Sequence, residues 1–227
     1  MGSTTLRRCL AAPLTAFVVA VGAIPVAAAP AREPDYVIER VETKDKVIFI
    51  TVDDGSHLSR ETTRYIRNKR IPITTFALPE PLNHHRRRFV NLLRQTGMTF
   101  ENHSRTHRSL SAMSYRGQRA EICAGNREIR RVINRSPMFL RPPGGALNND
   151  TTRAAKACGL ARIVLWNVVA DYGNIVRSGV GTGLQAGDIV LLHYLDSLPK
   201  SLDNVLREAR KRGLRPALLR DYIAPPS

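Results

Sequence analysis

The chain has 227 residues, 43% of them hydrophobic and 24% charged, which is enough apolar material for one sizeable folded domain. The ordinary charged fraction argues against a disordered chain, and three cysteines are too few for a scaffold built on disulfides. A formal net charge of +16 indicates either anionic polymers as partners or a well-solvated basic surface without a dedicated ligand. We expect no nucleic-acid partner, because aromatic residues make up only 6% of the chain and no zinc-finger spacing is present.

Residues 1–28 have the pattern of an export signal. Two arginines precede an uncharged, largely apolar segment, and small residues follow its apolar centre. We expect cleavage after Ala28, which would remove two arginines and no acid and lower the net charge from +16 to +14. This interpretation predicts a secreted or cell-wall-associated protein. The alternative is an uncleaved helix that anchors the protein in a membrane, because the uncharged segment is nearly long enough to cross a bilayer.

The remaining chain alternates short β-branched apolar runs with amphipathic segments, after a proline-rich linker or leading arm at 29–44. We place the domain at 45–222 and a tail at 223–227. The runs predict strands at 47–52, 73–78, 98–102, 138–140, 163–169, 189–193 and, more weakly, 216–219. The segments between them predict helices at 59–69, 86–96, 114–133, 149–157 and 201–212. This alternation predicts an α/β fold with a mainly parallel sheet of about seven strands, which could close or nearly close a barrel.

Polar residues follow the C-terminal ends of several predicted strands, where such folds carry their chemistry. Asp53 and Asp54 end the first strand, and adjacent residues leaving a strand point to different sides, so the two carboxylates should have different roles. His103 and His107 are spaced i, i+4, which on a helical turn places both imidazoles on one side, near enough to share a metal. A carboxylate from either aspartate would complete a metal site with one position open for water.

Each of these features alone also has an ordinary structural explanation. Asp-Gly is a common turn, and two histidines in a loop can be exposed polar residues. The same holds for the proline and glycine run at 141–145, which fits a plain loop, and for His193, which fits a core histidine on an apolar strand.

In combination, five segments resemble the five signature motifs of the polysaccharide deacetylase family, carbohydrate esterase family 4, with its NodB-type homology domain. They are 51–55 (TVDDG), 103–107 (HSRTH), 141–145 (RPPGG), 166–172 (WNVVADY) and 191–193 (LLH). The resemblance covers most of the chain, from about residue 44 to about residue 220. It implies a distorted (β/α) barrel in a single domain, a divalent metal that is usually zinc, and hydrolysis of N-acetyl or, less often, O-acetyl groups on an amino-sugar polymer such as peptidoglycan or chitin.

The resemblance also implies a role for each matched residue. Three would bind the metal: Asp54, His103 and His107. Four would serve the proton transfers, with Asp53 as general base, His193 as general acid, Arg141 orienting the base and Asp171 supporting the charged acid. Five would line the acetyl pocket and groove: Pro143, Gly144, Trp166, Tyr172 and Leu191.

The sequence departs from the family pattern mainly where the sugar would be contacted. Gly144 stands where an aromatic residue is usual, and Tyr172 where tryptophan is usual. Weak stacking and abundant positive charge together predict a preference for peptidoglycan or another anionic wall glycan over neutral chitin. The alternative function is a catalytically weak wall-binding protein that holds anionic polymer through its basic surface. For Cys123 and Cys158, a disulfide and two free buried thiols are both consistent with the sequence.

Overall fold

The computed structural model describes Met1 and residues 36–179 and 181–223. The predicted export signal beyond Met1, the first part of the leading arm and residues 224–227 of the tail lie outside the described residues. Among the residues that are described, no helix is long and apolar enough to cross a membrane.

One curled sheet organises the domain, and ten strands are found in the described part of the chain. The strands are β1 Val37–Ile38, β2 Val47–Asp54, β3 Ile73–Ala77, β4 Thr99–Asn102, β5 Phe139–Leu140, β6 Arg162–Val164, β7 Val168–Val169, β8 Val176–Arg177, β9 Ile189–His193 and β10 Arg215–Pro216. Their order is β1-β6-β5-β4-β3-β2-β9-β7-β8, with β10 paired to β2 off this path. Only the β7–β8 pair is antiparallel among these strands, so the predicted α/β fold with a mainly parallel sheet is confirmed.

The prediction of a single strand at 163–169 is wrong, because this segment forms two strands with different neighbours. β6 pairs with β5, whereas β7 begins four residues after β6 ends and pairs with β9, at the other end of the β5-β4-β3-β2-β9 path. At the switch, the side chain of Asn167 accepts from the N–H of Ile189 at 2.9 Å and donates to Asp188 at 2.9 Å. One segment thus connects the two ends of the path and curls the sheet into a distorted, incomplete barrel.

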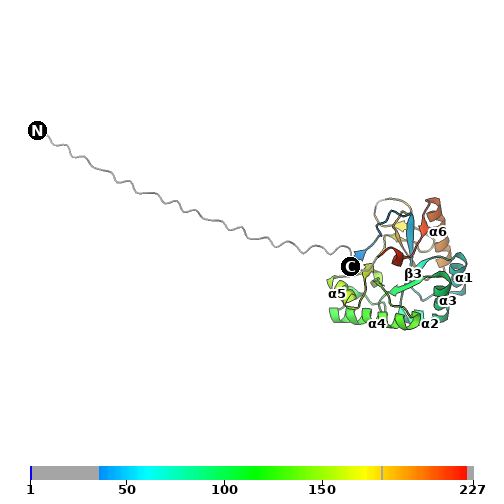
Figure 1. Ribbon diagram of the computed structural model, residues 1–227, viewed down its shortest axis with the longest axis horizontal. Coiled ribbons are helices and arrows are strands. Elements are labelled where there is room, and N and C mark those ends of the chain that lie inside the picture. The colour runs from blue at the N-terminus through cyan, green and yellow to red at the C-terminus, as the bar shows by residue number, and fades with distance from the viewer. Residues whose placement is uncertain (2–35, 180, 224–227) are drawn as a thin grey trace. The chain divides into compact units, whose positions relative to one another are not determined.

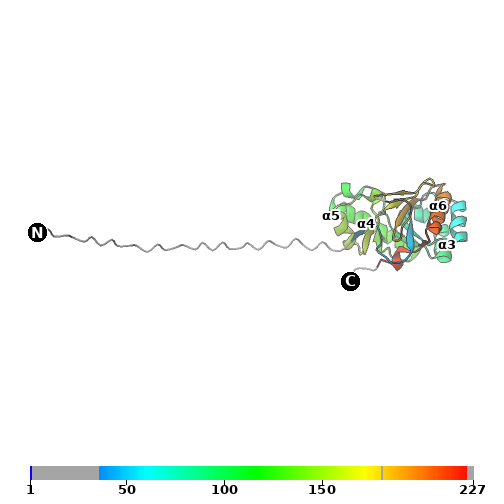
Figure 2. The same ribbon diagram turned by 90° about the horizontal axis from the view of Figure 1, so that it is seen from above.

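Helices cover the outer face of this sheet (Figures 1 and 2). They are α1 Arg60–Lys69, α2 Pro79–His84, α3 Arg86–Thr96, α4 Tyr115–Ile133, α5 Asn149–Ala157 and α6 Leu198–Lys211. Contacts run from α5 to α4, then α2, α3, α1 and α6, so the helices follow one another around the strands. Side-chain caps start two of these helices, since the Ser59 and Ser114 side chains each accept a backbone N–H in the first turn of α1 and α4.

Two helix predictions differ from the structure. The short helix α2 was not expected, because its six residues include two prolines and offer no 3.6-residue apolar period. Helix α6 starts at Leu198 rather than Ser201, with Pro199 in its first turn, where proline needs no backbone donor.

Strand β2 shows how the core is divided. Val47 and Phe49 belong to the apolar cluster inside the curled sheet, whereas Ile48, Ile50 and Val52 belong to the cluster between the sheet and the helices. The strand is therefore buried on both faces, which explains its continuous apolar sequence.

The sheet begins before residue 45, the start predicted for the domain. Val37 and Ile38 form β1 and pair with β6, and the buried Tyr36 donates its hydroxyl to the carbonyl of Leu160 at 2.7 Å. Val37 and Ile38 thus form an edge of the sheet inside the segment 29–44, for which a linker or leading arm was predicted. Strands of two residues, such as β1 and β8, carry little sequence pattern, which is the main reason why ten strands are found in the described residues beside the roughly seven expected.

Candidate active site

The two aspartates at the end of β2 face different partners, as the sequence predicted. Asp53 is 2% exposed and its Oδ1 accepts from the guanidinium of Arg141 at 2.8 Å. Asp54 has a left-handed backbone with φ of 74°, followed by Gly55 with φ of 103°, so the chain turns sharply as it leaves the strand. This turn directs the Asp54 carboxylate toward His103 and His107.

Asp54, His103 and His107 form a cluster that could hold a metal ion. The Nε2 atoms of His103 and His107 lie 3.6 and 3.5 Å from Asp54 Oδ1, and one ligand atom from each residue lies within 4.8 Å of the others. Asp54 Oδ1 is buried and accepts no hydrogen bond from the described residues. A buried oxygen without a donor beside two imidazole nitrogens fits a divalent cation.

The two histidines meet through a loop and not through a helical turn, which corrects the prediction. Residues 103–107 have no helical structure, and both Ser104 (φ of 67°) and His107 (φ of 60°) are left-handed. The backbone N–H of His107 donates to the Ser104 side chain at 3.1 Å, which folds the loop back. The centroids of the two imidazole rings lie 5.1 Å apart. The i, i+4 spacing therefore identified the pair correctly, although a folded loop and not a helical turn brings the rings together.

Helix α4 supports this loop through a residue that the motifs did not indicate. The Glu121 carboxylate accepts from the backbone N–H groups of Arg105 and Thr106 at 3.2 and 2.9 Å and from the Thr106 hydroxyl at 3.0 Å. Gly125 allows the close approach, because a Cβ at this position would lie 2.8 Å from the Asn102 side chain. No periodicity or motif could have singled out Glu121, because its partners are mainly backbone groups of a distant loop.

Hydrogen bonding and burial determine the tautomer and the protonation state of His103. Its Nδ1 lies 2.8 Å from the carbonyl oxygen of Arg141, an acceptor, so Nδ1 carries the proton and Nε2 presents its lone pair. Burial lowers the pKa of His103, while the nearby carboxylates of Asp53 and Asp54 act in the opposite direction. A neutral imidazole with Nε2 directed at Asp54 is the form that binds a metal.

The guanidinium of Arg141 is completely buried, and each of its three nitrogens donates at least one hydrogen bond. It donates to Thr51 at 2.8 Å and to the carbonyl oxygens of Val164 and Leu165 at 3.0 and 2.9 Å, besides its bond to Asp53. These acceptors hold the fork of donors in one orientation. The carboxylate of Asp53 is therefore fixed through Oδ1, and its Oδ2 accepts no hydrogen bond from the described residues.

His193 and Asp171 form a second pair beside the first. His193 Nδ1 lies 2.7 Å from Asp171 Oδ2, and the His193 backbone N–H donates to Asp171 Oδ1 at 3.0 Å. The hydrogen bond to Asp171 raises the pKa of His193, against the effect of partial burial. His193 is also the register partner of Asp53 on adjacent strands, so the two pairs lie side by side at the C-terminal end of the sheet.

The five residues expected to line a pocket differ in burial and in their position relative to His193 and the buried Arg141. The Trp166 ring lies 5.5 Å from the Arg141 guanidinium, and Leu191 is 4% exposed, two residues before His193 on β9. Pro143 is buried and starts a 3₁₀ turn in which the exposed Gly144 has a φ of 64°. Tyr172 is 70% exposed and makes no hydrogen bond or ring contact with another described residue. The structure thus places Trp166 beside the buried Arg141 and leaves the side chain of Tyr172 exposed to solvent.

Comparison with known proteins adds independent information. A family model described as polysaccharide deacetylase matches residues 40–163, more than half of the chain. An uncharacterized protein of Streptomyces coelicolor is 32% identical over 82% of this chain and 77% of its own. A peptidoglycan-N-acetylglucosamine deacetylase of Bacillus cereus is 26% identical over 79% of this chain and 89% of its own.

Among solved structures, a pseudoenzyme of carbohydrate esterase family 4 from Bacillus anthracis has a similar fold. Its TM-score is 0.70 at 18% identity, with 83% of this chain and 69% of that chain covered. Identity this low supports the fold alone. The residues present at the site, and not the fold, must therefore carry any argument about activity.

Proposed function

The chain belongs to the polysaccharide deacetylase family, a family of hydrolases, and from this premise we propose that it removes N-acetyl groups from an amino-sugar polymer of the cell wall with the help of a divalent metal. The observation that carries the proposal is the unpartnered, buried Asp54 Oδ1 between two imidazoles, next to the Arg141-held carboxylate of Asp53.

We propose Asp54, His103 and His107 as the metal ligands. Two neutral imidazoles and a carboxylate leave coordination positions open, which is the arrangement of catalytic sites, and this donor set suits zinc. A bound divalent ion supplies Lewis-acid chemistry, which polarises the acetyl carbonyl and makes water a better nucleophile near neutral pH.

Asp53 is the proposed general base. Arg141 occupies Oδ1, so Oδ2 is the atom that takes the proton of the attacking water. Oδ2 lies 3.7 Å from His103 Nε2, which places the base directly beside the metal ligands. The rigid guanidinium keeps this carboxylate from swinging into the metal site as a further ligand.

His193 is the proposed general acid. Its Nδ1–H is held by Asp171, so Nε2 is the atom that donates a proton to the leaving nitrogen as the carbon–nitrogen bond breaks. The oxygen of water ends in acetate, and the sugar keeps a free amine. The raised pKa of His193 keeps this acid protonated at a higher pH than an ordinary histidine.

For the substrate, we propose peptidoglycan or another anionic wall glycan in preference to neutral chitin. The support is the net charge of +16, the exposed position of Gly144 in place of an aromatic ring, and the exposed Tyr172. The relative from Bacillus cereus is named for deacetylation of peptidoglycan N-acetylglucosamine. Trp166 and Leu191 are the proposed walls beside the acetyl group. Pro143 and Gly144 are proposed to form the stretch of backbone that the substrate approaches.

We further propose that the protein is exported. The support is the charge and hydropathy pattern of residues 1–28, with cleavage after Ala28. Sequencing the N-terminus of the protein recovered from the culture medium and from the cell fraction tests this proposal. An intact residue 1 in a membrane fraction would favour the anchored alternative.

The decisive experiment measures acetate released from peptidoglycan and from N-acetylglucosamine oligomers. Activity should disappear with a chelator and return with a divalent metal. Asp53→Asn should remove activity while metal content stays, and Asp150→Asn, at the surface of α5, is the matched control. Absence of release from every acetylated glycan tried would overturn the deacetylase proposal and favour the weakly catalytic wall-binding alternative.

A further inference from the structure

A cavity of about 540 Å³ lies between α2 and α4, outside the cluster of proposed catalytic residues. Arg105 and Thr106 contribute to its wall, and both belong to the loop that carries His103 and His107. The cavity therefore shares a loop with the proposed metal site. Its volume is within the range of sites that bind small molecules or short peptides.

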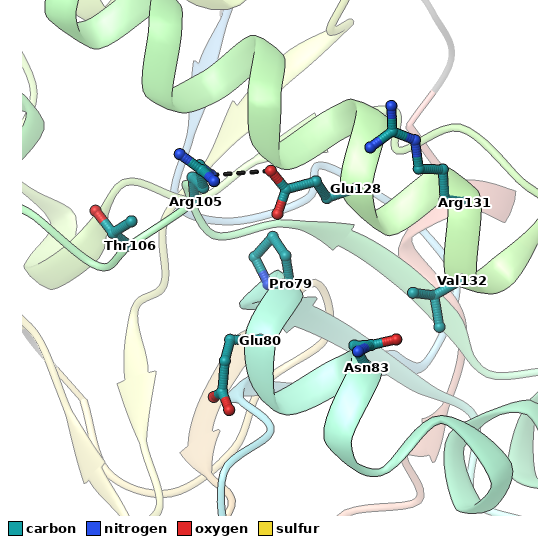
Figure 3. A pocket seen from close by; sticks show the side chains of 8 residues that line it. All are labelled: Pro79, Glu80, Asn83, Arg105, Thr106, Glu128, Arg131 and Val132. Carbon is teal, nitrogen blue, oxygen red and sulfur yellow. Dashed lines mark hydrogen bonds and ion pairs between the residues drawn. The ribbon is translucent and has the colours of Figure 1, made fainter.

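The charges that line the cavity are only partly matched (Figure 3). Arg105 pairs with Glu128 at 2.9 Å, which neutralises both groups. Glu80 from α2 and Arg131 from α4 also line the cavity, and neither forms an ion pair with any described residue. Figure 3 shows these two side chains on opposite sides of the cavity. One cation and one anion are thus available to a ligand at separate points.

The rest of the lining disfavours a neutral sugar ring as the occupant. The apolar part consists of Pro79 and Val132, and none of the described residues that line the cavity has an aromatic side chain on which a sugar face could stack. The Asn83 amide offers donors and an acceptor that suit peptide groups, and the Thr106 hydroxyl, whose proton is donated to Glu121, offers an acceptor. A ligand with a carboxylate and an ammonium group some distance apart would match the two free charges.

We propose that this cavity binds the peptide substituent of a peptidoglycan strand, with a peptide carboxylate at Arg131 and a peptide ammonium group at Glu80. The inference rests on the proposed function, because it assumes a wall glycan as substrate. A peptide held beside the loop of His103 and His107 would fix the position of the attached sugar chain relative to the proposed metal site. The cavity would thereby select glycan that carries peptide over bare glycan.

Two ligands test the inference, an N-acetylated disaccharide that carries a lysine-containing peptide with a free C-terminal carboxylate, and the same disaccharide without peptide. Their affinities for the protein are measured by calorimetry at low salt. The peptide-bearing compound should bind more tightly, and Arg131→Ala or Glu80→Gln should each reduce that advantage by about threefold to fivefold, the order expected for one solvent-accessible charge pair. The controls are Arg130→Ala and Glu61→Gln, which remove exposed charges that do not line the cavity.

Equal affinity for the two compounds, or an advantage that Arg131→Ala leaves unchanged, would overturn the inference. An advantage lost equally in the control variants would also overturn it, because a general charge effect would then suffice. Acetate release from both compounds is measured in parallel. If neither compound loses acetate, the proposed function fails, but the difference in binding still decides the role of the cavity.

Discussion

The imidazole of His103 donates from Nδ1 to the carbonyl oxygen of Arg141 at 2.8 Å. The guanidinium of Arg141 in turn donates to the carboxylate of Asp53, also at 2.8 Å. Arg141 therefore supports a proposed metal ligand through its backbone and the proposed base through its side chain. The two functions can be separated by mutation, because a substitution changes only the side chain.

Arg141→Lys should impair catalysis and leave the metal in place. Lysine lacks the planar fork that contacts Thr51, Asp53 and two carbonyl oxygens at once, so the base loses its orientation. We expect kcat to fall by about 10- to 100-fold, the range typical of residues that support metal sites. Metal content is measured by elemental analysis, and thermal unfolding checks that the buried substitution leaves the protein folded. Loss of the metal in a folded variant would contradict the separation of functions.

Asp171→Asn should shift the pH profile of activity. The hydrogen bond to Asp171 raises the pKa of His193, so the protonated acid persists to a higher pH than the ordinary value of about 6.5. Removing the negative charge lowers that pKa, and the alkaline limb of the profile of kcat should move toward lower pH. The acidic limb, which depends on other groups, should stay in place. An unchanged alkaline limb would show that another residue supplies the proton.

Much of the fold followed from the sequence because apolar runs and caps act locally. β9 has the bounds that its apolar run predicted, and α1 and α4 begin within one residue of their predicted starts, directly after Ser59 and Ser114. The division of residues 163–169 could not be predicted, because the switch depends on Asn167 meeting Asp188 and Ile189, which are distant in sequence. Local pattern carries no information about such a contact.

The candidate site likewise has features that the sequence predicted and features that it did not. The charged residues were visible because their types and spacing match a known set of motifs, whereas the loop geometry at 103–107 and the support from Glu121 were not. Both depend on hydrogen bonds between side chains and backbone groups, which leave no periodic signal in the sequence. The sequence therefore indicated which groups are present at the site, and the structure added what holds two of them together.

Glu121→Ala should weaken metal binding without removing any ligand. The carboxylate accepts three hydrogen bonds from residues 105 and 106, and their loss frees the loop to leave its left-handed conformation. We expect metal affinity to fall by about 10- to 100-fold, as for other groups that orient ligands. Competition with a coloured chelator measures the affinity. Glu208→Ala on α6, which removes an ion pair with Arg212, is the control and should leave affinity unchanged.

The disulfide between Cys123 and Cys158 should contribute strongly to stability. The structure joins α4 to the end of α5 through this bond, and the two cysteines are 35 positions apart in sequence. Closing a loop of this length restricts the unfolded chain, which corresponds to about 3–4 kcal/mol in the chain-entropy account. The double variant Cys123→Ala/Cys158→Ala should lose about 2–4 kcal/mol in urea unfolding. Alkylation of the untreated protein should modify neither cysteine, and two modified thiols would show that the bond is absent.

Positive charge should guide the choice of polymer in a manner that depends on salt. Helix α3 begins with Arg86 and Arg87, which are both exposed and have no ion pair among the described residues. Attraction between such groups and an anionic glycan weakens as the screening length falls from about 10 Å at 0.1 M to about 3 Å at 1 M salt. Binding of purified peptidoglycan should therefore weaken across a salt series, whereas binding of neutral chitooligomers should change little.

The double variant Arg86→Ala/Arg87→Ala separates this effect from contacts within the site. Its affinity for peptidoglycan should be lower than that of the wild-type protein at low salt. At high salt the two affinities should become similar, because the charges that the variant lacks are already screened. The variant Thr63→Ala, on the neighbouring helix α1, changes no charge and is the control. Neutral chitooligomers that bind as tightly as peptidoglycan at every salt concentration would contradict the role of charge. Substrate choice would then depend on short-range contacts around Trp166 and Leu191.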